Sequence, residues 1–82
     1  MNKIEKTIKV ITEIEKDELT TDEKKYYVIR LLNELRNELG EFDKINIRVF
    51  INILINDKNE LQFGVSCFHI KQYLNEIKGW YY

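Results

Sequence analysis

The stretch of sequence that decides the fold is Ile45–Ile55, which reads INIRVFINILI. Every odd position in it carries a β-branched residue, either Ile or Val. Alternation of this kind is typical of a β-strand with one buried face. After a polar break at residues 56–60, the sequence LQFGVSCFH at residues 61–69 alternates in the same way. The two stretches therefore predict the strands of one long antiparallel β-hairpin.

The register of this hairpin follows from its faces, because a one-residue slip would turn one apolar set toward water. Pairing Ile55 with Leu61, and continuing outward, keeps both odd-numbered sets on the same side of the sheet. Asp57-Lys58-Asn59 then forms the turn, and Asn59 can adopt the left-handed conformation that such a turn needs. The first strand would extend about 36 Å. A domain of 82 residues is narrower than that, so we expect the hairpin to project or to be shared with a second molecule.

The residues on either side of the hairpin predict helices. Residues 2–19 have apolar side chains at helical spacing, and Asn2 precedes Glu5 at the spacing of a helix cap. Alternation within residues 7–14 leaves a third β-strand as the other interpretation of that segment. Residues 70–81 predict a C-terminal helix, because their apolar residues share one helical face: Ile70, Tyr73, Leu74, Ile77 and Trp80 or Tyr81.

The clearest helix signal begins at Thr20, which forms a capping box with Glu23. Apolar residues follow at a spacing of 3.6, and Gly40 stands where a left-handed helix stop is expected. The apolar residues are Val28, Leu31, Leu32, Leu35 and Leu39. The predicted fold class is therefore α+β. A helical hairpin, a long antiparallel β-hairpin and a C-terminal helix form one domain, 1–82, which can complete a larger sheet by dimerisation.

Charge and composition exclude several function classes. The chain has 13 basic and 14 acidic residues and a net charge of −1, which offers no basic stripe to a phosphate backbone. No uninterrupted apolar segment is present at the N-terminus or elsewhere, so we expect a cytoplasmic protein without a membrane span. The single Cys excludes an internal disulfide.

Catalytic chemistry finds little support in the sequence. Cys67 and His69 would share a face of the second strand, about 7 Å apart, which is too far for a nucleophilic dyad. No third group is placed to orient them, and no set of zinc ligands accompanies them. Cys67 is better explained as a small core residue. We therefore predict a non-enzymatic protein without catalytic residues, metal or cofactor.

Exposed aromatic residues point instead to a partner. The even-numbered face of the hairpin carries apolar residues that belong either to the core or to an interface, and the sequence leaves this open. The chain also ends on three large aromatic residues, the types most enriched at binding hot spots. The candidate partner-binding residues are Tyr27, Phe50, Leu54, Phe68, Trp80, Tyr81 and Tyr82.

We therefore predict a small protein-binding module that forms a homodimer through the hairpin. Asn, Ile, Lys and Tyr, which have AT-rich codons, make up 35 of the 82 residues. This composition favours a phage or mobile-element accessory protein that regulates a host protein by occlusion, as an inhibitor, anti-defence factor or antirepressor. The alternative is a nucleic-acid-binding module that stacks bases on the aromatic face of the hairpin.

Overall fold

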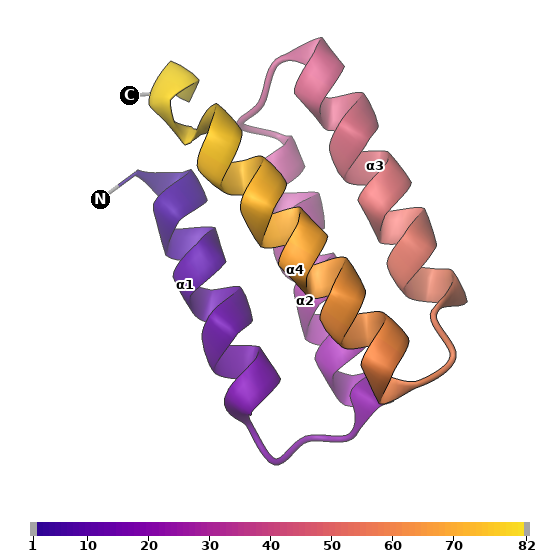
Figure 1. Ribbon diagram of the computed structural model, residues 1–82. Helices are drawn as coiled ribbons and strands as arrows, with labels where there is room; N and C mark the ends of the chain where they lie inside the picture. The colour runs from indigo at the N-terminus through magenta and orange to yellow at the C-terminus, as the bar shows by residue number, and fades with distance from the viewer. Residues whose placement is uncertain (1, 82) are drawn as a thin grey trace.

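The computed structural model describes residues 2–81, and all of its regular structure is helical. Within that range the elements are α1 (Lys3–Lys16), α2 (Thr21–Arg36), α3 (Glu41–Asn56), α4 (Glu60–Ile77) and a 3₁₀ turn, η1 (Lys78–Tyr81). The connections between helices are short, so consecutive helices run antiparallel (Figure 1). Helix α1 packs on α2 and α4, and α3 packs mainly on α2.

Local capping signals define where the first helices begin. The side chain of Asn2 accepts a hydrogen bond from the Glu5 N–H at 2.8 Å. This cap marks the start of a helix that includes residues 7–14, so the alternative of a third strand is wrong. Helix α1 ends at Lys16 rather than at residue 19. The capping box between Thr20 and Glu23 is confirmed, with both reciprocal hydrogen bonds present.

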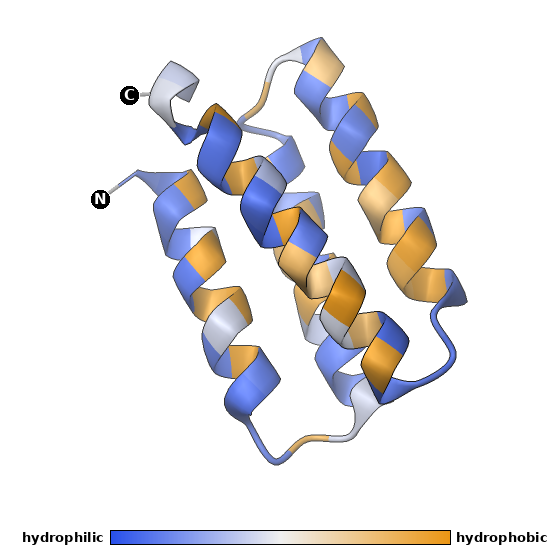
Figure 2. Ribbon diagram, viewed as in Figure 1, coloured by the Kyte–Doolittle hydropathy of each residue, from blue (hydrophilic) through white to orange (hydrophobic). Residues whose placement is uncertain are grey.

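The core lies between the four helices and takes residues from each of them. One side chain from each helix, fully buried, illustrates it: Ile11, Leu32, Leu54 and Leu74. The predicted apolar face of α2 is confirmed, since most of its residues are buried and Leu31 is half-buried against the same core. Figure 2 shows that apolar residues also recur densely along α3 and α4, beyond what one buried face requires.

The predicted β-hairpin is wrong, and with it the α+β fold class. No strand is present within residues 2–81; Ile45–Ile55 lies inside α3, and residues 61–69 lie inside α4. The odd positions of this run divide into two sets, and within each set the residues are four positions apart. Residues four apart lie on the same side of a helix, so the run also fits a helix with two apolar faces. The core buries one of these faces, which includes Ile47 and Ile51. A dimer through the hairpin is excluded because the hairpin does not exist.

The polar break was predicted at the right place but with the wrong geometry. Residues 57–59 connect two helices, and Asn59 caps α4 by accepting a hydrogen bond from the Gln62 N–H at 2.9 Å. Its φ is −147°, so it is not left-handed. Gly40 is likewise not a left-handed stop: its φ is −70° and it is the N-cap of α3. The predicted C-terminal helix is confirmed over residues 70–77, as the second half of α4.

Alanine substitutions at two neighbouring isoleucines distinguish the bundle from the hairpin. In the hairpin, Ile45 and Ile47 would share a buried face and cost similar stability when truncated. In the bundle Ile45 is 62% exposed and Ile47 is 0% exposed. We expect Ile47→Ala to lower the free energy of unfolding by about 2–5 kcal/mol, because it leaves a core cavity. Ile45→Ala should change it by less than about 1 kcal/mol when the folded unit is a single chain, as in dilute solution. Urea unfolding monitored by circular dichroism measures both, and equal losses would contradict the bundle.

Candidate interaction surface

Two apolar stripes face outward on the C-terminal half of the chain. On α3 the stripe consists of Phe42, Ile45, Val49 and Ile53, and on α4 of Leu61, Val65 and Phe68. Within each stripe the residues are three or four positions apart, which places them on one side of their helix. Scattered exposed apolar residues are ordinary, but aligned stripes of this kind mark interaction surfaces. We call them the α3 stripe and the α4 stripe.

The α4 stripe surrounds a hollow. Leu61, Gly64, Val65 and Phe68 stand at positions i, i+3, i+4 and i+7, which is the four-residue hole that receives a side chain of a facing helix in coiled-coil packing. With Glu60 at its edge, this hollow is a shallow depression, open to solvent, with a volume of about 560 Å³. Gly64 contributes no side chain to it, so its floor is helix backbone.

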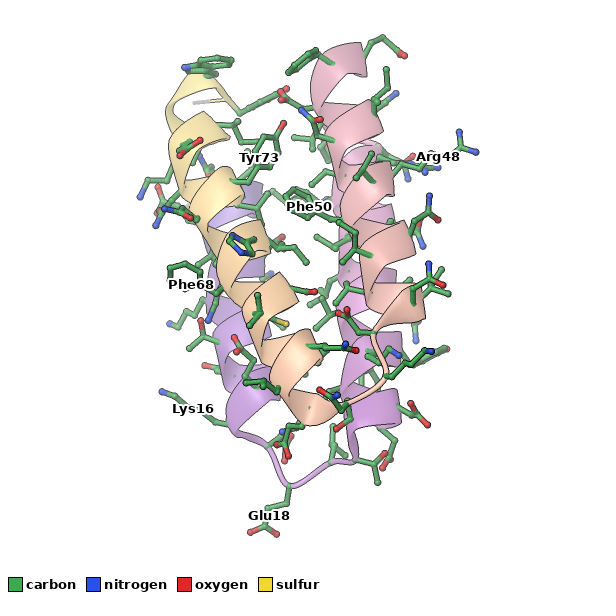
Figure 3. All side chains as sticks on the ribbon, turned by 45° about the vertical axis from the view of Figure 1, so that its right-hand side comes forward. Lys16, Glu18, Arg48, Phe50, Phe68 and Tyr73 are labelled. Atoms are coloured by element: carbon green, nitrogen blue, oxygen red, sulfur yellow. The ribbon has the colours of Figure 1, made fainter. Side chains whose placement is uncertain are left out.

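The two stripes belong to helices that pack against each other. In Figure 3, Phe68 points away from α3, on the side of α4 opposite to Phe50. Phe50 lies between α3 and α4, where its ring centroid is 5.6 Å from that of Tyr73. Arg48 projects outward from the far side of α3. Phe50 and Tyr73 thus fill the contact between α3 and α4, and Phe68 lies on the side of α4 away from that contact.

A buried polar cluster lies at the N-terminal end of α3. Asp43 is buried, and its carboxylate accepts hydrogen bonds from the hydroxyls of Tyr73 and Tyr81. The Tyr73 hydroxyl in turn accepts from the Asn46 amide at 3.0 Å, and the Tyr81 hydroxyl accepts from the Gly40 N–H at 2.9 Å. Gly40, the N-cap of α3, has no side chain that could accept a hydrogen bond. The Tyr81 hydroxyl instead accepts the hydrogen bond of the Gly40 N–H at that end of the helix. Asp43 also lies in the first turn, where the helix dipole favours a negative charge.

The cluster keeps its two tyrosines protonated. Burial, followed by the hydrogen bond to Asp43, raises the pKa of Tyr73 to about 12. The hydrogen bond to Asp43, followed by burial, also raises the pKa of Tyr81. Each carboxylate oxygen of Asp43 accepts one of these hydrogen bonds, and the side chain is buried away from solvent. The cluster fastens η1 to α3 and is a structural clamp.

Cys67 and His69 do not form a reactive pair. Two residues apart on a helix, they point about 200° apart, and Cys67 is buried while His69 is exposed. Burial, with a smaller effect of the negative charge of Glu15, raises the pKa of the Cys67 thiol to about 12. A thiol of this kind is an inert core residue. Within the described residues, no group of three or more His, Cys, Asp or Glu side chains could hold a metal ion.

A second groove, of about 530 Å³, runs between α1 and α2. Apolar side chains such as Val10 and Leu31 line it, and the pair Arg30–Glu34, with 3.8 Å between the Nε and Oε1 atoms, lies at its rim. Tyr27 is part of this lining. Unlike the α4 hollow, the groove is bordered by charges of both signs, including Asp17. No feature of the groove selects one ligand chemistry.

The predicted partner-binding residues do not come together in one site. Phe68 and Trp80 are exposed on α4 and η1, whereas Tyr27 is on α2. Phe50 is half-buried between α3 and α4, and Leu54 is in the core. The remaining two are Tyr81, which belongs to the polar cluster, and Tyr82, which lies outside the described residues.

Most residues of the stripes were missed for an identifiable reason, although Phe68 was among the predicted partner-binding residues. Ile45, Val49 and Ile53 were assigned to one buried strand face, because residues 45–55 were interpreted with a period of two, and Phe42 was left out. Interpreted with a period of 3.6, the same segment has two apolar faces, and a bundle has room for only one of them. The spacing of Leu61, Gly64, Val65 and Phe68 was also visible in the sequence, but it has meaning only on a helix.

Comparison with known proteins gives no match: no protein family model matches the chain, and no curated protein or solved structure is significantly similar to it. No helix within residues 2–81 combines the length and apolar character needed to cross a membrane. What the chain can do must therefore be inferred from its own surface and its own side-chain chemistry.

The polar cluster makes stability sensitive to alkaline pH. Because the pKa of Tyr73 is about 12 in the folded chain and about 10 when unfolded, the unfolded state loses that proton first as the pH rises. The stabilisation is therefore complete below pH 10 and declines as the pH rises to 12. Tyr73→Phe should lower stability at neutral pH but flatten this decline. Urea unfolding at a series of pH values measures it, with Tyr26→Phe, an exposed tyrosine, as the control that keeps the slope.

Proposed function

We propose that the chain is a non-enzymatic protein-binding module, and that the hollow of the α4 stripe receives an apolar side chain from a helix of another protein. The observation that carries this proposal is Gly64. Glycine inside a helix costs about 0.5–1 kcal/mol relative to alanine. A Cβ atom added at Gly64 would have nothing within 4 Å. The packing of this chain therefore gives no reason for glycine there, whereas the approach of an outside side chain would.

The chemistry around the hollow defines the partner. Residues 61–70 contain no Asp, Glu, Lys or Arg, so the hollow would repel a charged side chain through the cost of removing it from water. Three large apolar residues, Leu61, Val65 and Phe68, are exposed around it. Burying a side chain of this size contributes about 1.5–3 kcal/mol when burial is complete. The favoured occupant is an uncharged aliphatic or aromatic side chain on an amphipathic helix.

The chemistry of the remaining candidate groups supports binding rather than catalysis. Cys67 is buried with a raised pKa, and Asp43 is buried with each carboxylate oxygen hydrogen-bonded to a tyrosine hydroxyl. The stacking platform of the nucleic-acid alternative required a β-hairpin, and Phe50, one of its aromatics, packs against Tyr73 instead. A module that covers the surface of another protein would act by occlusion. That the occluded protein belongs to the host of a phage or mobile element stays a prediction.

Gly64→Ala provides the first test, through stability. We expect it to raise the free energy of unfolding by about 0.5–1 kcal/mol, because alanine loses less backbone freedom on folding and meets no steric obstacle. Urea unfolding measures the gain. A decrease in stability would show that the chain itself needs glycine at this position, and the argument for an outside partner would fail.

A binding experiment with a defined probe provides the second test. The probe is a soluble helical peptide with leucine at heptad positions a and d, and binding is measured by isothermal titration calorimetry. Gly64→Phe fills the hollow while adding apolar surface, and we expect it to weaken binding at least tenfold, since a knob no longer enters. Gly79→Ala, where an added Cβ also meets nothing within 4 Å, is the control that leaves binding unchanged. Unchanged or tighter binding by Gly64→Phe would mean that the surface acts only through general hydrophobicity.

A further inference from the structure

The α3 stripe is a second unpartnered surface, and it differs from the α4 stripe in shape. The core of the bundle buries one side of α3 through Ile47, Ile51 and Leu54. The fold of one chain does not bury the opposite side. That side carries a row of exposed apolar side chains on a helix of 16 residues, about 24 Å long. It is a ridge rather than a hollow. We propose that its occupant is a second copy of this chain, with α3 packed antiparallel on the α3 of the partner.

The spacing of the α3 stripe is what a two-fold symmetric contact requires. In such a contact the same surface is used by both copies, so it must be complementary to itself. Ile45 and Ile53 stand four residues before and four residues after Val49. An antiparallel copy centred on Val49 therefore places Val49 against its own equivalent, and Ile45 against the Ile53 position of the other copy. Each apolar residue of the stripe core then meets another apolar residue.

The charge along α3 supports the same occupant. Between Ile45 and Asn56 the only charged residue is Arg48, and Figure 3 shows its side chain projecting outward from α3. Interface cores are depleted of charged residues, while charged residues remain at the rim. By contrast, residues 3–36 of α1 and α2 contain many charged residues of both signs, including Lys3, Glu13 and Arg30. Among the four helices, α3 and α4 offer the least charged surfaces.

A dimer interface would take only part of the surface of this chain. The chain exposes 5503 Å², and a standard interface takes about 800 Å² from each partner, roughly one seventh of that surface. The α3 stripe would supply the apolar centre of this interface, with Phe42 at the periphery, and the residues that flank α3 would supply its rim.

Two valines provide a matched test of this proposal. Val49 on the α3 stripe and Val65 on the α4 stripe are each 50% exposed, so Val→Lys is the same chemical change at both positions. Size-exclusion chromatography with light scattering over a concentration series should give the wild-type chain twice the 10.0 kDa mass of one chain. Val49→Lys should give the mass of one chain, because two lysines would face each other across the symmetry axis. Val65→Lys should remain a dimer. Circular dichroism and thermal unfolding check that both variants are folded.

Disulfide trapping supplies an independent measurement. The native thiol of Cys67 is buried and has a raised pKa, so a cysteine introduced on the surface is the only one that reacts readily. Val49→Cys should form a covalent dimer on mild oxidation, and Val65→Cys should not do so under the same conditions. A monomeric wild-type chain at every concentration, or cross-linking at position 65 but not at position 49, would overturn the proposal.

The same variants separate this inference from the proposed function, which uses a different surface. Val49→Lys should retain binding of the leucine-rich helical peptide, because the α4 hollow is untouched. Val65→Lys should lose that binding while remaining a dimer. A dimer that binds no peptide would contradict the proposed function alone, and a monomer that binds peptide would contradict this inference alone.

Discussion

Helix α3 has apolar side chains on two opposite faces, and a four-helix bundle can bury only one of them. The packing against α2 and α4 selects the face that includes Ile47 and Leu54. Ile45 and Val49 are left in water. This constraint explains why apolar side chains on the outer face of α3 stay exposed in the folded chain. It also means that the fold of a single chain leaves part of its hydrophobic free energy available for association.

The end of the bundle that contains the starts of α1 and α3 is held by polar as well as apolar contacts. The buried carboxylate of Asp43 accepts hydrogen bonds from two tyrosine hydroxyls. Buried polar groups of this kind are costly unless every partner is present. Here the Tyr81 hydroxyl also accepts a hydrogen bond from the Gly40 N–H, and the Asn2 amide donates a hydrogen bond to the Lys78 carbonyl at 3.2 Å. The clamp thus ties η1 to the starts of α1 and α3.

The two outward surfaces complement each other because they differ in both position and shape. A ridge that matches itself suits a second copy, whereas a hollow built around Gly64 suits a protruding side chain that this chain does not place there. Figure 3 shows Phe68, beside the hollow, pointing away from α3. A partner on α3 would therefore leave Phe68 accessible, and a dimer would present two hollows. Two linked sites of this kind raise the effective concentration of a partner that has two matching helices.

The sequence by itself determined the features that depend on neighbours in the chain. The caps at Asn2 and Thr20, the apolar face of α2 and the position of the polar break at residues 57–59 all follow from contacts within a few residues. The choice between strand and helix for residues 45–55 was different, because their odd-numbered apolar residues satisfy both periods equally well. Only packing against the other helices decided it. Tertiary structure likewise created the cluster around Asp43, whose tyrosine partners lie 30 and 38 residues away, because no local pattern records contacts at that separation.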